Sequence, residues 1–237
     1  MRFLLTRPRE DSEKLARNLT RLGHSSLIDP LITIEPCGPG KINLSLYEAV
    51  LLTSANGARA LARTTDKRDI PLFAVGEATA NAARAAGFTT IQTAGGDVHT
   101  LTQLVSHSLS PQSGPLLHVA GKTIAGDLQG QLKKWHFQVD RIVLYTARPA
   151  DSFSTATIDE LHKGSLNSIV FYSPRTARIF KKLITQYDLG HRLATISALC
   201  LSHAVVEQLK PLTFKDVITA DNPTTQALFA PLGIDMS

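Results

Sequence analysis

Short runs of apolar residues alternate along the chain with longer segments whose apolar residues recur at helical spacing. The short runs predict β-strands at Phe3–Thr6, Ser26–Ile34, Val50–Thr53, Leu72–Val75, Thr90–Thr93, Leu116–Ala120, Val139–Thr146, Ser168–Tyr172, Thr195–Leu201 and Asp216–Thr219. The longer segments predict helices at Glu10–Leu22, Gly57–Arg63, Thr79–Ala86, Thr100–Leu109, Ala125–Lys134, Thr176–Tyr187, Ala204–Leu209 and Thr224–Leu232. Repeated alternation of strand and helix is typical of an α/β fold with parallel sheets.

The pattern of these elements repeats in the two halves of the chain. The junction Leu52–Arg59 (LTSANGAR) resembles Phe171–Arg178 (FYSPRTAR), and Phe73–Gly76 resembles Leu199–Ser202. Because the matches keep their order, we expect two similar α/β units whose insertions are confined to loops. Two units of about 110 residues each are of normal domain size.

The composition is that of an ordinary globular protein, with 43% hydrophobic and 19% charged residues. No apolar run approaches the roughly 18 residues of a membrane span, and the first one is too short for a signal peptide, so we expect a cytoplasmic protein. The two cysteines, Cys37 and Cys200, show no metal or redox spacing, and the eight histidines are scattered. We therefore expect no disulfide, no metal and no cofactor.

The net charge of +5 is spread along the chain, and only 6% of the residues are aromatic. This distribution argues against nucleic-acid binding, and it suits either a small polyanionic ligand or a plain solvated surface. A nucleotide-dependent Rossmann enzyme is disfavoured, because the segment after Gly76 lacks the GxGxxG spacing. The segment Gly121-Lys122-Thr123 likewise lacks the earlier glycine of a phosphate loop.

Several short motifs, in a fixed order over nearly the whole chain, resemble the uroporphyrinogen-III synthase family. They are Leu4–Pro8 followed by Pro30–Ile32, then Leu52–Gly57, Phe73–Ala80, Tyr172–Pro174 and Ala220–Thr224. The resemblance implies two parallel-sheet α/β lobes joined by a two-strand crossing, with the chain interleaved between them. One lobe would contain residues 1–34 and 150–237, with both termini, and the other residues 35–149. The internal repeat alone would suggest two consecutive halves.

The same resemblance implies an enzyme, a hydro-lyase of porphyrin and heme biosynthesis. It would cyclise hydroxymethylbilane to uroporphyrinogen III, with inversion of the terminal pyrrole ring and loss of water. The family pattern implies no cofactor, a monomer, and transient contact with hydroxymethylbilane synthase, with no nucleic acid and no membrane as partners. The alternative is a non-catalytic two-lobed module that binds a small polyanion.

Tyr145 is the candidate catalytic residue, since it ends the apolar strand Ile142–Leu144 beside an expected lobe crossing. A phenol can donate a proton to a leaving hydroxyl, and in the family the matching tyrosine faces the cleft and is the best candidate for the general acid. Tyr145 could equally be a half-buried strand tyrosine whose hydroxyl is satisfied. A pure binding module has no need of this phenol.

The candidate substrate-binding residues lie where strands end and helices begin. Hydroxyls there either cap the helix or join its free N–H groups in binding carboxylates. The candidates are Arg7, Thr53, Ser54, Gly76, Thr79, Lys122, Ser173, Arg175, Ser202 and Thr224. The turn after Leu116–Ala120 often carries arginines in the family; here Ala120 and Ala125 take those places and Lys122 supplies the cation. Ser202 and Val205 stand where the family often has glycine and threonine.

Overall fold

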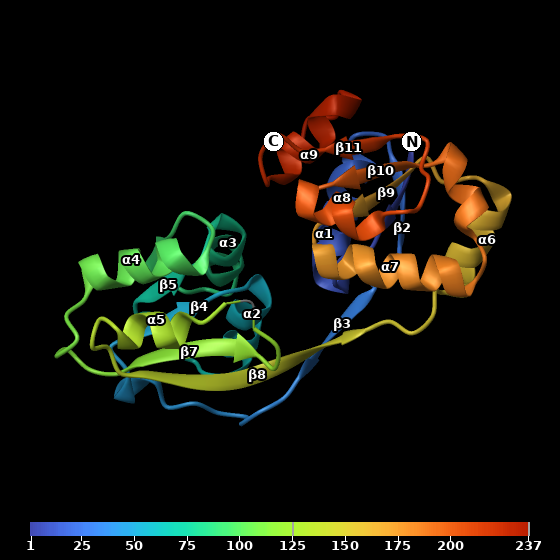
Figure 1. Cartoon of the computed structure of the whole chain (residues 1–237). Helices are drawn as coiled ribbons and strands as arrows, with labels where there is room; N and C mark the ends of the chain where they lie inside the picture. Colours follow the sequence, from blue (N-terminus) through green and yellow to red (C-terminus); the bar gives the residue numbers. More distant parts are fainter. Residues whose placement is uncertain (125, 237) are drawn as a thin grey trace. The chain divides into compact units, whose positions relative to one another are not determined.

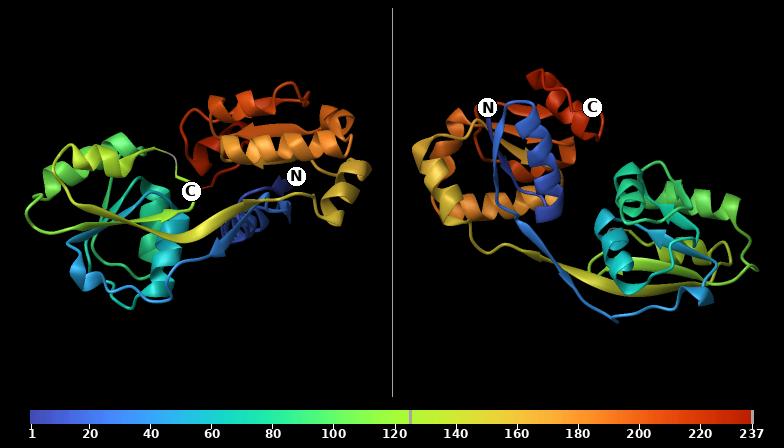
Figure 2. Two further views of the ribbon diagram at one scale, coloured as in Figure 1. Left: turned by 60° about the horizontal axis from the view of Figure 1, so that its bottom comes forward. Right: turned by 180° about the vertical axis from the view of Figure 1, so that it is seen from behind.

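The computed structural model describes residues 1–124 and 126–236, and the chain divides into two compact units. Unit 1 comprises Met1–Thr33 and Arg148–Ser237, and unit 2 comprises Ile34–Ala147. Both marked chain ends belong to unit 1 (Figure 2). Within the described ranges, no helix is long and apolar enough to cross a membrane.

Unit 1 is built on a five-stranded sheet of order β11-β10-β9-β1-β2 in which every neighbouring pair is parallel. The strands are β1 (Arg2–Leu5), β2 (Ser25–Ile28), β9 (Ser168–Phe171), β10 (Ser197–Cys200) and β11 (Val217–Thr219). Helices cover both faces (Figure 1): α1 (Arg9–Arg21), α6 (Thr155–Lys163), α7 (Pro174–Gln186), α8 (His203–Leu209) and α9 (Thr225–Phe229). Leu4 faces a core formed with α6, α7 and α8, whereas Phe3 and Leu5 face α1 and α9. Alternate strand residues thus contribute to two apolar layers, one on each face of the sheet.

Unit 2 has a six-stranded sheet of order β3-β8-β7-β4-β5-β6. Its strands are β3 (Ile32–Pro36), β4 (Ala49–Leu52), β5 (Leu72–Ala74), β6 (Ile91–Thr93), β7 (Leu116–Gly121) and β8 (Val139–Pro149). The pairs from β8 to β6 are parallel. The core on one face includes residues of α2 (Ala55–Thr64) and α3 (Glu77–Ala85), and the core on the other includes residues of α4 (Val98–Ser108) and α5 (Leu128–Lys133).

Two neighbouring strands, β3 and β8, carry the chain between the units. The unit boundary falls within β3 at Thr33 and within β8 at Ala147. Backbone hydrogen bonds tie the two passages together, with the Ala150 N–H donating to the Leu31 carbonyl at 3.0 Å and the Cys37 N–H donating to the Leu144 carbonyl at 3.0 Å. The predicted fold class, two parallel-sheet α/β lobes joined by a two-strand crossing, is confirmed.

The prediction of one strand over Ser26–Ile34 was wrong. The segment forms two strands, β2 and β3, which belong to different sheets. Pro30 lies between them and has no N–H to give to a ladder. The carboxylate of Asp29 instead accepts a hydrogen bond from the Ser154 N–H at 3.0 Å, which fixes the break against the start of α6.

Helix α6 was not predicted, although its end signals are in the sequence. Ser154 caps its start by accepting from the Thr157 N–H at 3.2 Å. Gly164 ends the helix in the left-handed conformation, with φ of 65°. A serine cap and a glycine stop are the usual signature of a short helix.

Several further element boundaries differ from the predictions by a few residues. The helix predicted from Ala125 begins at Leu128, because Asp127 caps it by accepting from the Gly130 N–H; Ala125 itself lies outside the described residues. The helix predicted over Thr224–Leu232 ends at Phe229 and continues as a 3-10 turn over Ala230–Leu232 that contains a proline. The strand predicted from Thr195 begins at Ser197, after a 3-10 turn over Gly190–Thr195.

Candidate functional site

The hydroxyl of Tyr145 meets the hydroxyl of Ser54 at the carboxyl ends of the strands of unit 2. The two oxygens are 2.7 Å apart, and either can be the donor. Ser54 lies two residues after the end of β4, and Tyr145 lies in β8 at the level where β7 ends. The Tyr145 side chain is buried, with 8% of its surface exposed. A buried phenol is therefore held at the sheet edge where parallel α/β folds bind ligands.

A bulge in β8 turns Tyr145 toward Ser54. Ile142 and Leu144 pack in the core next to α2 and α3, so strict alternation would point Tyr145 to the opposite face. The pairing with β7 shifts instead, from Ala120 opposite Val143 to Gly121 opposite Tyr145. The extra residue in β8 puts Tyr145 in the same core as Leu144. Bulges of this kind commonly re-aim a side chain beside a functional site.

Gly121 provides the space into which the Tyr145 ring fits. A Cβ atom on Gly121 would lie 2.7 Å from both Cε2 and Cζ of Tyr145, and 3.0 Å from the phenol oxygen. No side chain fits at such distances without moving the ring. The N–H of Lys122, the next residue, donates to the Tyr145 carbonyl at 2.9 Å. The end of β7 therefore fixes both the backbone and the ring of Tyr145.

Ser54 also caps helix α2. Its Oγ accepts a hydrogen bond from the Gly57 N–H at 3.0 Å, in the extended backbone conformation typical of an N-cap. The positive end of the α2 dipole therefore lies beside the hydroxyl pair. The expected capping role of Ser54 is present, and the contact with Tyr145 adds to it.

Thr53 contacts a buried histidine, His118 of β7. Thr53 Oγ1 lies 3.3 Å from His118 Nε2, while His118 Nδ1 has no hydrogen-bond partner among the described residues. Burial, together with the positive charge of Arg141, lowers the pKa of His118 to about 4. His118 is consequently neutral at physiological pH, and one of its ring nitrogens accepts.

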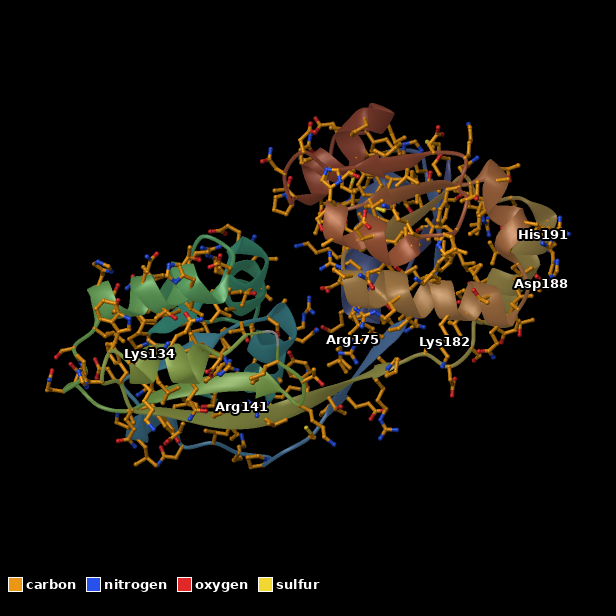
Figure 3. All side chains as sticks on the ribbon, in the orientation of Figure 1. Lys134, Arg141, Arg175, Lys182, Asp188 and His191 are labelled. Atoms are coloured by element: carbon orange, nitrogen blue, oxygen red, sulfur yellow. The ribbon has the colours of Figure 1, made fainter. Side chains whose placement is uncertain are left out.

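Arg141 holds the turn that follows β7. Its guanidinium donates to the carbonyls of Gly121, at 2.8 Å, and Lys122, at 3.2 Å. Figure 3 labels Arg141 beside β7 and β8. The Lys122 side chain itself is exposed, so its charge is available to a ligand. A residue of β8 thus stabilises the turn that carries the candidate cation.

Gly76 and Thr79 lie at the start of α3, where β5 ends. Gly76 is the N-cap residue in an extended conformation, and a Cβ there would lie 3.4 Å from the Cα of Gly96. The Thr79 side chain is buried, with 4% of its surface exposed, and its N–H donates to the Gly76 carbonyl at 3.0 Å. Contact between a ligand and this turn would therefore involve backbone more readily than the Thr79 hydroxyl.

In unit 1, Arg7 packs over the ring of Tyr172. The guanidinium carbon is 4.2 Å from the ring centroid, and Arg7 also pairs with Asp11 at 3.0 Å. The Tyr172 hydroxyl donates to Thr225 Oγ1 at 3.2 Å, and burial raises the pKa of Tyr172. The cation–π contact orients Arg7 at the carboxyl ends of β1 and β9.

The other candidates of unit 1 begin three helices at the same sheet edge. Ser173 caps α7 by accepting from the Thr176 N–H at 3.1 Å, and Thr224 caps α9 by accepting from the Ala227 N–H at 3.2 Å. Ser202 precedes α8 and makes no capping bond through its side chain. Arg175 lies in the first turn of α7 (Figure 3) and is engaged in an interaction of its own. Within unit 1 these residues share the carboxyl edge of the sheet with Arg7.

Sequence reasoning missed four residues that shape these sites. They are Gly121, His118, Arg141 and Tyr172. A glycine at the end of a buried strand, followed by a lysine turn, was the available signal for Gly121. The others become visible only when strand pairing is known. Among the described residues no group of three His, Cys, Asp or Glu side chains could hold a metal ion.

Comparison with known proteins gives one family and one fold. The sequence matches the family described as uroporphyrinogen-III synthase HemD over residues 13–230. Among solved structures, the chain is similar to uroporphyrinogen-III synthetase from Helicobacter pylori, with 16% identity, 98% of both chains covered and a TM-score of 0.59. It is also similar to a mutant uroporphyrinogen III synthase from Thermus thermophilus, with 16% identity, 98% of this chain and 96% of the other covered, and a TM-score of 0.52. None of the curated proteins matches the sequence. At this identity the structural likenesses establish the fold.

Proposed function

Because this chain belongs to the uroporphyrinogen-III synthase family, we propose that it converts hydroxymethylbilane to uroporphyrinogen III with Tyr145 as the proton donor. The family match covers most of the chain and carries the reaction class. The observation that supports the residue assignment is the buried phenol of Tyr145, held at the carboxyl edge of the sheet 2.7 Å from Ser54.

The proton transfer starts the reaction. The Tyr145 O–H bond breaks, the proton passes to the substrate hydroxyl, and the C–O bond breaks as water leaves. The electrophilic methylene-pyrrole end is then attacked by the substituted position of the terminal ring, which gives a spiro intermediate. Fragmentation and re-closure invert that ring. The terminal ring releases one proton as its aromaticity returns, and this proton restores the Tyr145 phenol.

The enzyme must select one closure, because hydroxymethylbilane cyclises unaided to the unrearranged isomer. Holding a single conformer can supply much of the required advantage. The substrate carries many carboxylates, which helix N-termini and cations bind well. In unit 2 these groups are the turns at Thr53, Gly76 and Lys122, with Thr79 acting through its backbone. In unit 1 they are Arg7 and the helix starts at Ser173, Arg175, Ser202 and Thr224.

We further propose that the chain works as a cytoplasmic monomer without a cofactor. The instability of the substrate favours a transient contact with hydroxymethylbilane synthase, which would shorten the time the substrate spends free. A sedimentation experiment on the two purified proteins tests the monomeric state and the contact with the synthase. We expect this chain to sediment at the monomer mass and to form a weak, concentration-dependent complex with the synthase. A stable dimer of this chain would contradict the proposed monomer.

The isomer of the product tests the proposed function. The purified protein is mixed with freshly prepared hydroxymethylbilane in the presence of a chelator, and the cyclised products are separated. We expect predominantly isomer III, at a rate that exceeds spontaneous closure. A non-catalytic binding module would bind the substrate and leave only the unrearranged isomer, which would overturn the proposal.

A further inference from the structure

We propose that Ser54 is a positioning residue whose hydroxyl donates a hydrogen bond to the Tyr145 oxygen while the Tyr145 proton moves to the substrate. The inference rests on the proposed role of Tyr145 as proton donor. It assigns to Ser54 a part in the chemistry in place of direct carboxylate binding.

The hydrogen-bonding groups of Ser54 allow its hydroxyl to donate to Tyr145. A serine hydroxyl has one donor hydrogen and two acceptor lone pairs. One lone pair is taken by the Gly57 N–H at 3.0 Å, and the Tyr145 oxygen lies at 2.7 Å. If Tyr145 donated to Ser54, its proton would point away from a substrate. When Ser54 donates, the Tyr145 proton is free to face the substrate hydroxyl.

A negative charge develops on the Tyr145 oxygen as its proton moves to the substrate. Hydrogen bonds to an ionised oxygen are about twice as strong as those to a neutral one. The Ser54 hydroxyl therefore stabilises the phenolate more than the phenol, and only such differential stabilisation raises kcat. The Gly57 N–H and the positive end of the α2 dipole polarise the Ser54 hydroxyl further in the same direction.

The fit around Tyr145 makes the arrangement rigid. Gly121 leaves no spare room beside the ring, and the Lys122 N–H holds the Tyr145 carbonyl at 2.9 Å. Ser54 is fixed in turn by its bond to Gly57. The Ser54 and Tyr145 oxygens therefore do not have to move when the proton leaves. A hydrogen-bond donor that is already in place stabilises the developing charge most effectively.

Two substitutions separate this role from helix capping. Ser54→Gly removes the hydroxyl but keeps a residue that is well tolerated at the start of a helix. Ser54→Thr keeps a hydroxyl at the same position. Ser154→Gly is the matched control, because Ser154 caps α6 through the same bond to the third residue, at 3.2 Å, and lies outside the catalytic and binding residues.

The experiment measures kcat, KM and product isomer for these variants in two backgrounds, wild type and Tyr145→Phe. With Tyr145 present, Ser54→Gly should lower kcat roughly 10- to 100-fold with little change in KM, and Ser54→Thr should restore most of kcat. Ser154→Gly should leave kcat unchanged. In the Tyr145→Phe background, Ser54→Gly should change kcat less than about twofold, because a residue that acts through Tyr145 has nothing left to support.

The outcomes distinguish the two levels of the account. If Tyr145→Phe loses activity but Ser54→Gly keeps full kcat, Ser54 only caps the helix and the inference is overturned, while the proposed role of Tyr145 stands. Equal losses from Ser54→Gly in both backgrounds would also overturn it, since Ser54 would then act independently. If Tyr145→Phe keeps full activity, both the proposed donor and the inference fall.

Discussion

Gly121 and Tyr145 face each other across the bulged end of the β7–β8 pair, with room for a hydrogen atom but not for a methyl group. An added Cβ would be 2.7 Å from two ring carbons of Tyr145. The bulge brings these residues opposite each other, and it also turns the phenol toward Ser54. One irregularity in a parallel ladder therefore places the candidate proton donor.

Gly121→Ala should displace the Tyr145 ring and reduce activity. A reacting group misplaced by about 1 Å can cost about 100-fold in rate, and overpacking costs about 1–3 kcal/mol of stability. We expect kcat to fall by at least about 10-fold while the protein stays folded, as judged by circular dichroism and steady-state kinetics. Gly40→Ala, where an added Cβ meets nothing within 4 Å, is the control. Full activity in Gly121→Ala would show that the close fit is not needed.

Acid should destabilise the protein through His118. The pKa of His118 in the folded state, about 4, lies below its usual 6.5 because of burial and of Arg141. The unfolded chain therefore binds more protons between pH 6.5 and 4, so the stability contributed by neutral His118 is complete above pH 6.5 and is lost as pH falls toward 4. The loss is at most about 3.5 kcal/mol, at about 1.4 kcal/mol per pKa unit.

Thermal unfolding between pH 7.5 and 4.5 checks this linkage. His118→Leu should show a smaller fall in Tm over this range than the unsubstituted protein. His107→Gln, which changes an exposed histidine of α4, should behave like the unsubstituted protein. If Tm falls equally with pH in His118→Leu and in the unsubstituted protein, the pKa of His118 is not lowered by folding.

Arg7→Gln should weaken substrate binding. The guanidinium is oriented by Tyr172 and Asp11, and a charged hydrogen bond to a carboxylate contributes about 1.5–3 kcal/mol. We expect KM to rise about 10-fold with kcat nearly unchanged. Arg9→Gln removes an exposed cation whose ion pair with Glu13 is long, at 3.9 Å, and should leave KM as it is. If both variants have the KM of the unsubstituted protein, Arg7 only stabilises the turn before α1.

The sequence contained enough local information for most elements and for several caps. For serines at strand–helix junctions, such as Ser54 and Ser173, helix capping was one of the two roles expected, and both serines cap helices. Pro30 carried the signal for the break between β2 and β3, but the apolar run across it favoured a single strand. The contact of Tyr145 with Ser54 could not be predicted, because simple alternation after Leu144 points Tyr145 the other way. Bulges and buried pairs such as Thr53 with His118 depend on strand pairing, which a local pattern does not contain.

Tyr145→Phe tests the central claim most directly, because it removes the donor and keeps the ring. The Ser54 hydroxyl remains on the helix cap, so the cost in stability should be only about 1 kcal/mol. Removal of a positioned acid typically lowers the rate by about 10²- to 10⁴-fold. The measurement is the rate of isomer III formation from fresh hydroxymethylbilane, with Tm recorded on the same samples. We predict a fall in that range with Tm almost unchanged; full production of isomer III by Tyr145→Phe would contradict the account and make Tyr145 a structural residue.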